Sequence, residues 1–282
     1  MYLHSEGRVD FFVRLLQRLK IYDAVKTIRA SFYRLTPRYL REQKAMLSFY
    51  GQFIHAGDMC FDIGANVGNR TEIFLKLGAR VVAVEPQSSC IRKLEKKFKG
   101  DDRITIIQEA AGEKTGTAEL LVSEATTISS LSAEWITCVR ESGRFSAYFW
   151  GKRERVKINT LDRLISQYGI PVFCKIDVEG YEYQVIRGLT QPVGVVSFEF
   201  TPEYLEPVLN SIRHLSGLGE AKFNYSPGET MQLALADWVT ADEIIHILTT
   251  LPDKSVFGDV YVRFLKSEIR TRCEPSGSPS IV

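Results

Sequence analysis

Glycines and carboxylates cluster at the ends of apolar runs in this chain. The apolar run Met59–Ile63 leads into Gly64-Ala65-Asn66-Val67-Gly68, and Glu85 ends the next apolar run, 23 residues after Asp62. Glycines permit a tight turn and the close approach of a ligand to the backbone. A carboxylate at the end of the following strand can accept hydrogen bonds from ribose hydroxyls. This spacing predicts a strand-loop-helix unit that binds a nucleoside.

The loop residue Asn66 distinguishes between two kinds of cofactor. A dinucleotide site would show Gly-x-Gly-x-x-Gly, whose middle glycine lets the pyrophosphate approach the backbone. Asn66 would crowd a pyrophosphate and Asp62 would repel it, whereas Asp62 suits the cationic aminoacyl group of S-adenosylmethionine. We therefore expect S-adenosylmethionine rather than a nicotinamide cofactor. Its predicted binding residues are Asp62, Gly64, Asn66, Gly68 and Glu85.

A third strand end supplies further candidates for cofactor binding. Gln108-Glu109-Ala110-Ala111-Gly112 follows the strand expected over 103–107. Glu109, or the backbone of Ala110, would contact the adenine ring. The alternative is that Glu109 belongs to an ordinary solvent-facing loop.

Acidic residues also follow the apolar strands expected over 172–176 and 193–198. Asp177 and Glu179 come after the first of these strands and Glu199 after the second, so all three should lie at the edge of the sheet that holds the cofactor. Transfer of a methyl group to a hydroxyl needs a group that orients the oxygen and removes its proton late. We expect Asp177 to be this base, with Glu199 as the second choice and Asp177 also lining the cofactor site. Lys175 is a further candidate for the catalytic group, and we expect it to pair with one of these carboxylates.

The same three carboxylates could instead form a metal site. Hard cations such as Mg²⁺ favour carboxylate oxygens. Carboxylates at strand ends are more often hydrogen-bonded to backbone or to basic side chains, so we favour a site without metal.

Strand-like and helix-like runs alternate through most of the chain, which is typical of a parallel sheet with crossover helices. Two late strands, predicted over 221–225 and 259–265, fit an antiparallel strand at the sheet edge. The earlier strands are expected over 59–63, 80–84, 103–107, 117–122, 156–159, 172–176 and 193–198. The helices are expected over 67–77, 88–98, 161–168, 181–189, 202–215 and 241–251.

Three segments stand apart from this alternation. Residues 1–44 hold ten Lys or Arg against four Asp or Glu, and so carry +6 while the rest of the chain carries −4. Their apolar residues recur at helical spacing, which predicts a basic amphipathic segment over 1–45 that packs on protein or lies on an anionic membrane. Residues 123–155 are expected to form an insertion that faces the substrate, where Thr126 to Leu131 could close over the cofactor and Tyr148, Phe149 and Trp150 could stack on a sugar. The Pro- and Ser-rich residues 267–282 are expected to be a disordered tail, which leaves 46–266 as the main domain.

Composition limits where the protein is expected to act and what it is expected to bind. The five cysteines are scattered without a Cys-x-x-Cys pair, which favours a reducing cytoplasm. No apolar stretch approaches the length of a membrane span. The negative charge of the main domain opposes nucleic-acid binding. The chain could also form a homo-oligomer, because the basic segment could pack on a second copy.

Several of these motifs together resemble one known family. Asp62 to Gly68, Val84-Glu85-Pro86, Ile158-Asn159-Thr160-Leu161-Asp162 and the string from Lys175 to Glu182 look like the FkbM-type methyltransferases. The resemblance covers about residues 58–200, with a weaker echo at Gly258-Asp259-Val260-Tyr261. It implies an α/β fold of the Rossmann-like class I methyltransferase type, with a mostly parallel seven-stranded sheet, helices on both faces and an antiparallel edge strand. It also implies O-methylation of a sugar, glycan or natural-product hydroxyl. The alternative function is a non-catalytic module that keeps the fold and binds a membrane surface or a partner.

Overall fold

A computed structural model describes residues 36–253 and 255–265 of the chain. The chain divides into two compact units, Met1–Ser48 and Phe49–Val282, and helix α3 (Pro37–Tyr50) contains the boundary. Most of the predicted basic segment and all of the predicted tail lie outside the described residues, so those predictions stay predictions. All strands of the described residues belong to the second unit.

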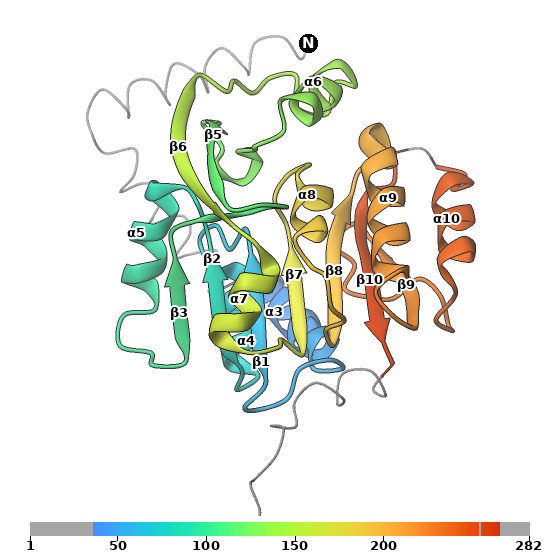
Figure 1. The fold of residues 1–282 in the computed structure, drawn as a ribbon, viewed down its shortest axis with the longest axis horizontal. Coiled ribbons are helices and arrows are strands. Elements are labelled where there is room, and N and C mark those ends of the chain that lie inside the picture. The colour runs from blue at the N-terminus through green and yellow to red at the C-terminus, as the bar shows by residue number, and fades with distance from the viewer. Residues whose placement is uncertain (1–35, 254, 266–282) are drawn as a thin grey trace, which may run out of the picture. The chain divides into compact units, whose positions relative to one another are not determined.

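A seven-stranded sheet forms the centre of this unit within the described residues, in the order β3-β2-β1-β7-β8-β10-β9 (Figure 1). All its strands run parallel except β10, which pairs antiparallel with both β8 and β9. The strands are β1 (Met59–Ile63), β2 (Arg80–Val84), β3 (Ile104–Ile107), β7 (Phe173–Ile176), β8 (Val195–Phe200), β9 (Ala221–Pro227) and β10 (Gly258–Phe264). This confirms the predicted fold, and it places the reversed strand one position in from the edge.

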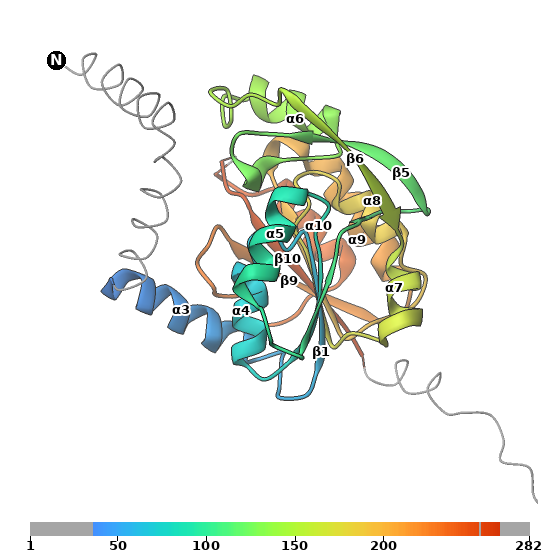
Figure 2. The same cartoon turned by 90° about the vertical axis from the view of Figure 1, so that its left-hand side faces the viewer.

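Helices cover both faces of the sheet (Figures 1 and 2). They are α4 (Asn69–Lys76), α5 (Ser88–Lys97), α7 (Leu161–Tyr168), α8 (Glu182–Arg187), α9 (Leu205–Ser216) and α10 (Ala241–Thr249). The periodic pattern predicted each of the six, and local signals set several of their ends. Thr160 caps α7 by accepting from the Arg163 N–H, and Thr240 with Glu243 forms a capping box at α10.

One face of the sheet is apolar and holds the main core. Cys174, Ile176, Val196 and Phe198 of β7 and β8 point to this face, together with buried residues of α7, α8, α9 and α10. Because side chains alternate along a strand, the intervening residues point the other way. This face therefore supplies most of the buried apolar area that stabilises the fold.

The opposite face mixes aromatic and charged side chains. Phe173 of β7 packs against the rings of Tyr50, Phe53 and Phe74 at centroid distances of 5.6, 5.7 and 5.6 Å. The next residue of β7 on this face is Lys175, which is only 1% exposed. A buried charge of this kind needs partners, and these lie at the carboxyl ends of the parallel strands.

The segment between β3 and α7 forms a small sheet of its own. β4 (Ala110–Ala111), β6 (Lys152–Asn159) and β5 (Gly116–Val122) pair in that order, and the 3-10 turn Thr126–Ile128 and helix α6 (Ala133–Glu141) lie between β5 and β6. Figures 1 and 2 show the hairpin and α6 beyond the carboxyl ends of the parallel strands. The predicted insertion is thus part of a separate layer above that edge. In the part of the chain that the structure describes, no helix is long and apolar enough to cross a membrane.

Candidate active site

The loop between β1 and α4 adopts backbone conformations that its residues suit. Gly64, Asn66 and Gly68 all have positive φ, at 84°, 47° and 76°. A Cβ on Gly64 would lie 1.8 Å from the carbonyl oxygen of Asp177, so this position requires glycine. Asn tolerates the left-handed conformation better than most residues. The loops after β1 and β7 are therefore in close contact.

Glu85 braces this loop from the end of β2. Its Oε2 accepts from the Asn66 N–H at 2.8 Å and its Oε1 accepts from the Gln87 N–H at 2.7 Å. The side chain is buried, and burial raises the pKa of Glu85 to about 7 although these two backbone bonds lower it. Each oxygen keeps further lone-pair capacity, so the predicted contact with ribose fits this geometry.

Asp62 lies beneath α4 rather than in the loop itself. It is 2% exposed, and its Oδ2 accepts from the Thr71 hydroxyl. Burial raises the pKa of Asp62, while Thr71 and Lys175 lower it. The side chain anchors the start of α4, and its contact with the aminoacyl group stays a prediction.

Glu109 and Ala110 are tied to the small sheet. Glu109 accepts from the side-chain amide of Asn159 at 2.9 Å, and Ala110 is buried in β4 opposite Ile158. Glu109 also lines a groove of about 370 Å³ that extends to Tyr168 of α7. The predicted contact with adenine is untested.

Lys175 lies between two carboxylates. Its Nζ is 3.0 Å from Asp259 Oδ1 and 3.3 Å from Asp177 Oδ2. Burial lowers the pKa of Lys175, but Asp177 and Asp259 outweigh burial and hold it well above its usual value. Lys175 is therefore an ammonium ion that neutralises this edge of the sheet, and the expected pairing with Asp177 is present. The sequence offered only a weak signal for the second partner, in the string Gly258-Asp259-Val260-Tyr261.

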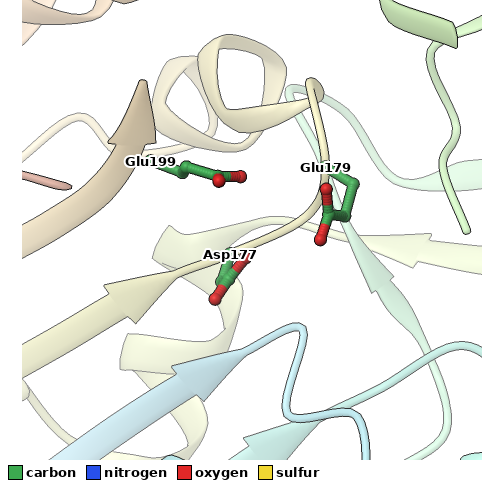
Figure 3. A group of neighbouring side chains, drawn as sticks. All are labelled: Asp177, Glu179 and Glu199. Carbon is green, nitrogen blue, oxygen red and sulfur yellow. The ribbon is translucent and has the colours of Figure 1, made fainter. Parts of the chain in front are cut away.

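Three carboxyl groups converge above this pair. One oxygen from each of Asp177, Glu179 and Glu199 lies within 4.8 Å of the other two (Figure 3). Burial and the other two carboxylates raise the pKa of Glu179 well above its usual value. Burial, Asp177 and Glu182 do the same for Glu199. Since like charges this close oppose ionisation, the cluster favours a ligand or proton that brings positive charge.

The loop that carries Asp177 and Glu179 is held in a strained form, whereas Glu199 lies in β8. Glu179 has a φ of 55° and Gly180 a φ of 87°. Glu182 Oε1 accepts from the N–H groups of Val178 at 3.0 Å and Gly180 at 3.2 Å. A Cβ on Gly180 would lie 2.1 Å from the buried ring of Trp135, so α6 packs directly on this turn. No sequence signal indicated this contact between the turn and the insertion.

The insertion also closes on the cofactor loop. The hydroxyl of Thr126 lies 3.5 Å from Asn66 Oδ1, and the hydroxyl of Ser130 donates to the carbonyl of Glu179. The three aromatic residues expected to stack on a sugar differ in their exposure to solvent. Tyr148 and Phe149 are 44% and 65% exposed, whereas Trp150 is half-buried and donates to the carbonyl of Ile128 at 2.7 Å.

Comparison with known proteins identifies the family. The model of the methyltransferase FkbM domain matches residues 62–206, which is about half of the chain. The chain belongs to the FkbM methyltransferase family. The match spans the cofactor loop, the insertion and all three clustered carboxyls. Together with the strand order, it makes the chain an S-adenosylmethionine-dependent methyltransferase.

More distant similarities add little to this. An rRNA methylase from Streptococcus thermophilus is 10% identical with a TM-score of 0.39, over 78% of this chain and 94% of that one. Precorrin-6y C5,15-methyltransferase from Geobacter metallireducens is 10% identical with a TM-score of 0.40, over 78% and 87%. No curated protein sequence matches the chain. The fold assignment rests on the strand order of this chain itself.

The site fits S-adenosylmethionine in shape and charge. The positive-φ turn at Gly64 and the lone pairs left on Glu85 can receive a nucleoside. The cluster of Asp177, Glu179 and Glu199 supplies acidic groups that can attract a cationic sulfonium. A neutral or anionic cofactor would gain nothing from these carboxylates.

Proposed function

We propose that this methyltransferase transfers the methyl group to a hydroxyl oxygen of a sugar, glycan or natural-product acceptor. The observation that carries the proposal is the convergence of Asp177, Glu179 and Glu199 beside the loop that binds the cofactor. A hydroxyl is a weak nucleophile that must lose its proton, and carboxyl groups at the reacting position provide a proton acceptor. They also provide hydrogen bonds for the other hydroxyls of a polyol.

Asp177 is the proton acceptor in this proposal. Lys175 supplies a compensating positive charge 3.3 Å from Asp177 Oδ2, so a carboxylate can be maintained there. Burial and the neighbouring carboxyl groups raise the pKa values of Glu179 and Glu199, and the oxygens of both side chains can form hydrogen bonds with other hydroxyls of the acceptor.

The reaction balances without a metal. S-adenosylmethionine, when bound, supplies an electrophilic methyl group on its sulfonium. Asp177 orients the acceptor hydroxyl and takes its proton as the new carbon–oxygen bond forms and the old bond to sulfur breaks. Trp135 and the 3-10 turn Thr126–Ile128 lie over this edge and limit the access of water.

The experiment begins with cofactor binding. We expect calorimetry to show S-adenosylmethionine bound to the purified protein, and release of S-adenosylhomocysteine with a panel of sugar, glycan and polyketide hydroxyls. Asp177→Ala should abolish turnover and leave cofactor affinity nearly unchanged. Asp101→Asn, at a partly buried carboxylate that pairs with Arg103, is the matched control and should behave as the wild type.

Three outcomes would count against the proposal. Absence of cofactor binding would remove it at the first step. A large loss of cofactor affinity in Asp177→Ala would make Asp177 a cofactor ligand rather than the base. A loss of turnover with EDTA that Mg²⁺ restores would assign the carboxyl cluster to a metal.

A further inference from the structure

A groove lies beside α7, at the end of β3. Its volume is about 370 Å³, and small-molecule sites in proteins commonly occupy about 300–1,000 Å³. Its walls come from the ends of β3 and β6, the start of β5 and one side of α7. The main sheet, the small sheet and a helix therefore meet around one cavity of the size that a small ligand needs.

The groove lies on the opposite side of the main sheet from α5. Leu164 of α7 packs in the same core as Val82 of β2, whereas Ile91 of α5 packs with Ala83, which points to the other face of β2. Figure 2 shows α5 and α7 on opposite sides of the sheet. Of the predicted site residues, only Glu109 lines the groove. It is thus a separate site from the glycine loop and the carboxyl cluster.

Two cations from different elements line this groove. Lys157 comes from β6 and Arg163 from α7, and in the part of the chain that the structure describes neither side chain forms an ion pair or a hydrogen bond. Arg153, on the same face of β6, pairs instead with Glu119 at 2.9 Å. Two positive charges beside one cavity repel each other, and an anion between them removes that repulsion. A phosphate group offers the charge and the oxygens that both side chains can bind.

A carboxylate is held in place in the same groove. The side-chain amide of Asn159 donates to Glu109 Oε2 at 2.9 Å, and its carbonyl oxygen accepts from the Thr160 N–H at 3.0 Å. Both ends of the Asn159 side chain are engaged, so the direction of Glu109 is set. Its second oxygen can accept from a ligand N–H or O–H. Because a carboxylate repels a bare phosphate ion, this pair favours a ligand whose donor group is distant from its anionic group.

The remaining walls suit a flat ring. Ile107 and Ile158 line the groove together with Tyr168, and all three side chains are partly buried. Apolar and aromatic side chains pack against the faces of a nucleobase regardless of its type. A nucleotide combines such a ring with N–H groups on its edge and a phosphate at its far end. A sugar phosphate lacks the flat apolar faces.

We propose that this groove binds a nucleotide. Lys157 and Arg163 bind its phosphate, Tyr168 packs on its base, and Glu109 accepts a hydrogen bond from an N–H group of the base. Glu109 then serves this ligand rather than the adenine of the cofactor. The site is additional to the cofactor site, and the inference does not depend on the identity of the methyl acceptor.

The test is calorimetry on the full-length protein with AMP, GMP, CMP and UMP as probes. Saturating S-adenosylhomocysteine is present, so that the nucleoside site of the cofactor is occupied. At least one nucleotide should bind, with one site per chain. Lys157→Ala and Arg163→Ala should each weaken its binding about threefold to thirtyfold. Glu109→Gln should weaken it about threefold to tenfold and reduce the preference among the four bases.

Matched controls separate the groove from general effects of charge and folding. Arg153→Ala removes a cation from the same face of β6 outside the groove and should leave nucleotide affinity unchanged. Lys157→Ala and Arg163→Ala should bind S-adenosylmethionine as the wild type does, which shows that they are folded. Ribose 5-phosphate and inorganic phosphate should bind at least about tenfold more weakly than the preferred nucleotide.

Four results would overturn the inference. They are the absence of nucleotide binding when S-adenosylhomocysteine is present, unchanged affinity in both cation variants, inorganic phosphate or ribose 5-phosphate bound as tightly as the nucleotides, and equal weakening of S-adenosylmethionine by the cation variants. The third result would make the groove a simple phosphate site, and the fourth would make it part of the cofactor site. None of them affects the proposed methyl transfer, which is measured by release of S-adenosylhomocysteine.

Discussion

On one face of β7 and β8, Cys174, Ile176, Val196 and Phe198 belong to a continuous apolar core, whereas Lys175, Ser197 and Glu199 occupy the intervening positions on the other face. Both sets are largely withdrawn from water. The apolar set stabilises the fold by burial alone, but the polar set is tolerated only because its charges meet partners from other strands and loops. The same two strands therefore stabilise the protein through one face and hold its chemistry on the other.

Removal of the ammonium from the polar face should have the largest effect. Lys175→Met leaves Asp177 and Asp259 facing each other, and we expect it to lower the free energy of unfolding by about 3–5 kcal/mol and to abolish turnover. Ile176→Val, on the apolar face, should cost only about 1 kcal/mol and spare cofactor binding. Urea denaturation and calorimetry measure both. A stable Lys175→Met protein would show that the charge is not needed for folding.

Phe198 and Glu199 are neighbours on β8 and test the same difference between the apolar and polar faces. Phe198→Ala creates a cavity in the apolar core and should cost about 3–5 kcal/mol while a folded sample keeps most of its turnover per molecule. Glu199→Gln removes a carboxyl from a crowded acidic cluster, so it should stabilise the protein by about 1 kcal/mol and reduce turnover. Thermal unfolding and initial rates would test both, and destabilisation by Glu199→Gln would contradict the account.

The free energy of unfolding should depend on pH because the pKa of Glu182, in the polar region, is raised in the folded state. Burial and Asp177 raise the pKa of Glu182 to about 7, against the lowering effect of its backbone hydrogen bonds. Because the folded state binds this proton more tightly than the unfolded state, the stabilisation is complete below the unfolded pKa and is lost as the pH rises to about 7. Glu182→Gln still offers an oxygen to Val178 and Gly180, so its stability should fall less over that range.

A control with the opposite sign is available in α10. Thr240 lowers the pKa of Glu243 through its N–H and hydroxyl groups, so Glu243 stabilises the fold above its unfolded pKa and loses this effect as the pH falls. Glu243→Gln should therefore be less stable than the wild type near neutral pH. Denaturant titrations across pH 4 to 8 would distinguish the two variants, and parallel curves for Glu182→Gln and wild type would refute the assignment.

The smallest expected effect concerns Ser197. Its buried hydroxyl has no hydrogen-bond partner among the described residues. Ser197→Ala should be neutral or stabilise the protein by up to about 1 kcal/mol, because it removes an unsatisfied polar group. Thermal unfolding with Thr71→Val, which removes the bond to Asp62 and should destabilise, provides the comparison. A clear loss of stability in Ser197→Ala would indicate a partner for that hydroxyl.

The sequence predicted the apolar face better than the polar one. Periodicity located β1, β2 and α7 because burial of apolar side chains leaves a repeating pattern. The pairing of Lys175 with Asp259 left no such pattern, since it depends on β10 folding back between β8 and β9. The strands expected over 117–122 and 156–159 are present as β5 and β6, but the two-residue strand β4 is too short to be recognised, so the sequence did not indicate that they form a separate small sheet. Arg70 and Glu229 lie 159 residues apart and meet only through the tertiary fold.

The strand order also sets a sequence of events during synthesis. β10 lies between β8 and β9 in space, yet it is translated after both. β9 must therefore wait on the nascent chain without its partner strand until β10 emerges, and Lys175 must wait for Asp259. Pairings between such distant segments form slowly and leave strand edges exposed meanwhile. A chaperone that shields β8 and β9 during this interval would raise the yield of folded protein without touching its final stability.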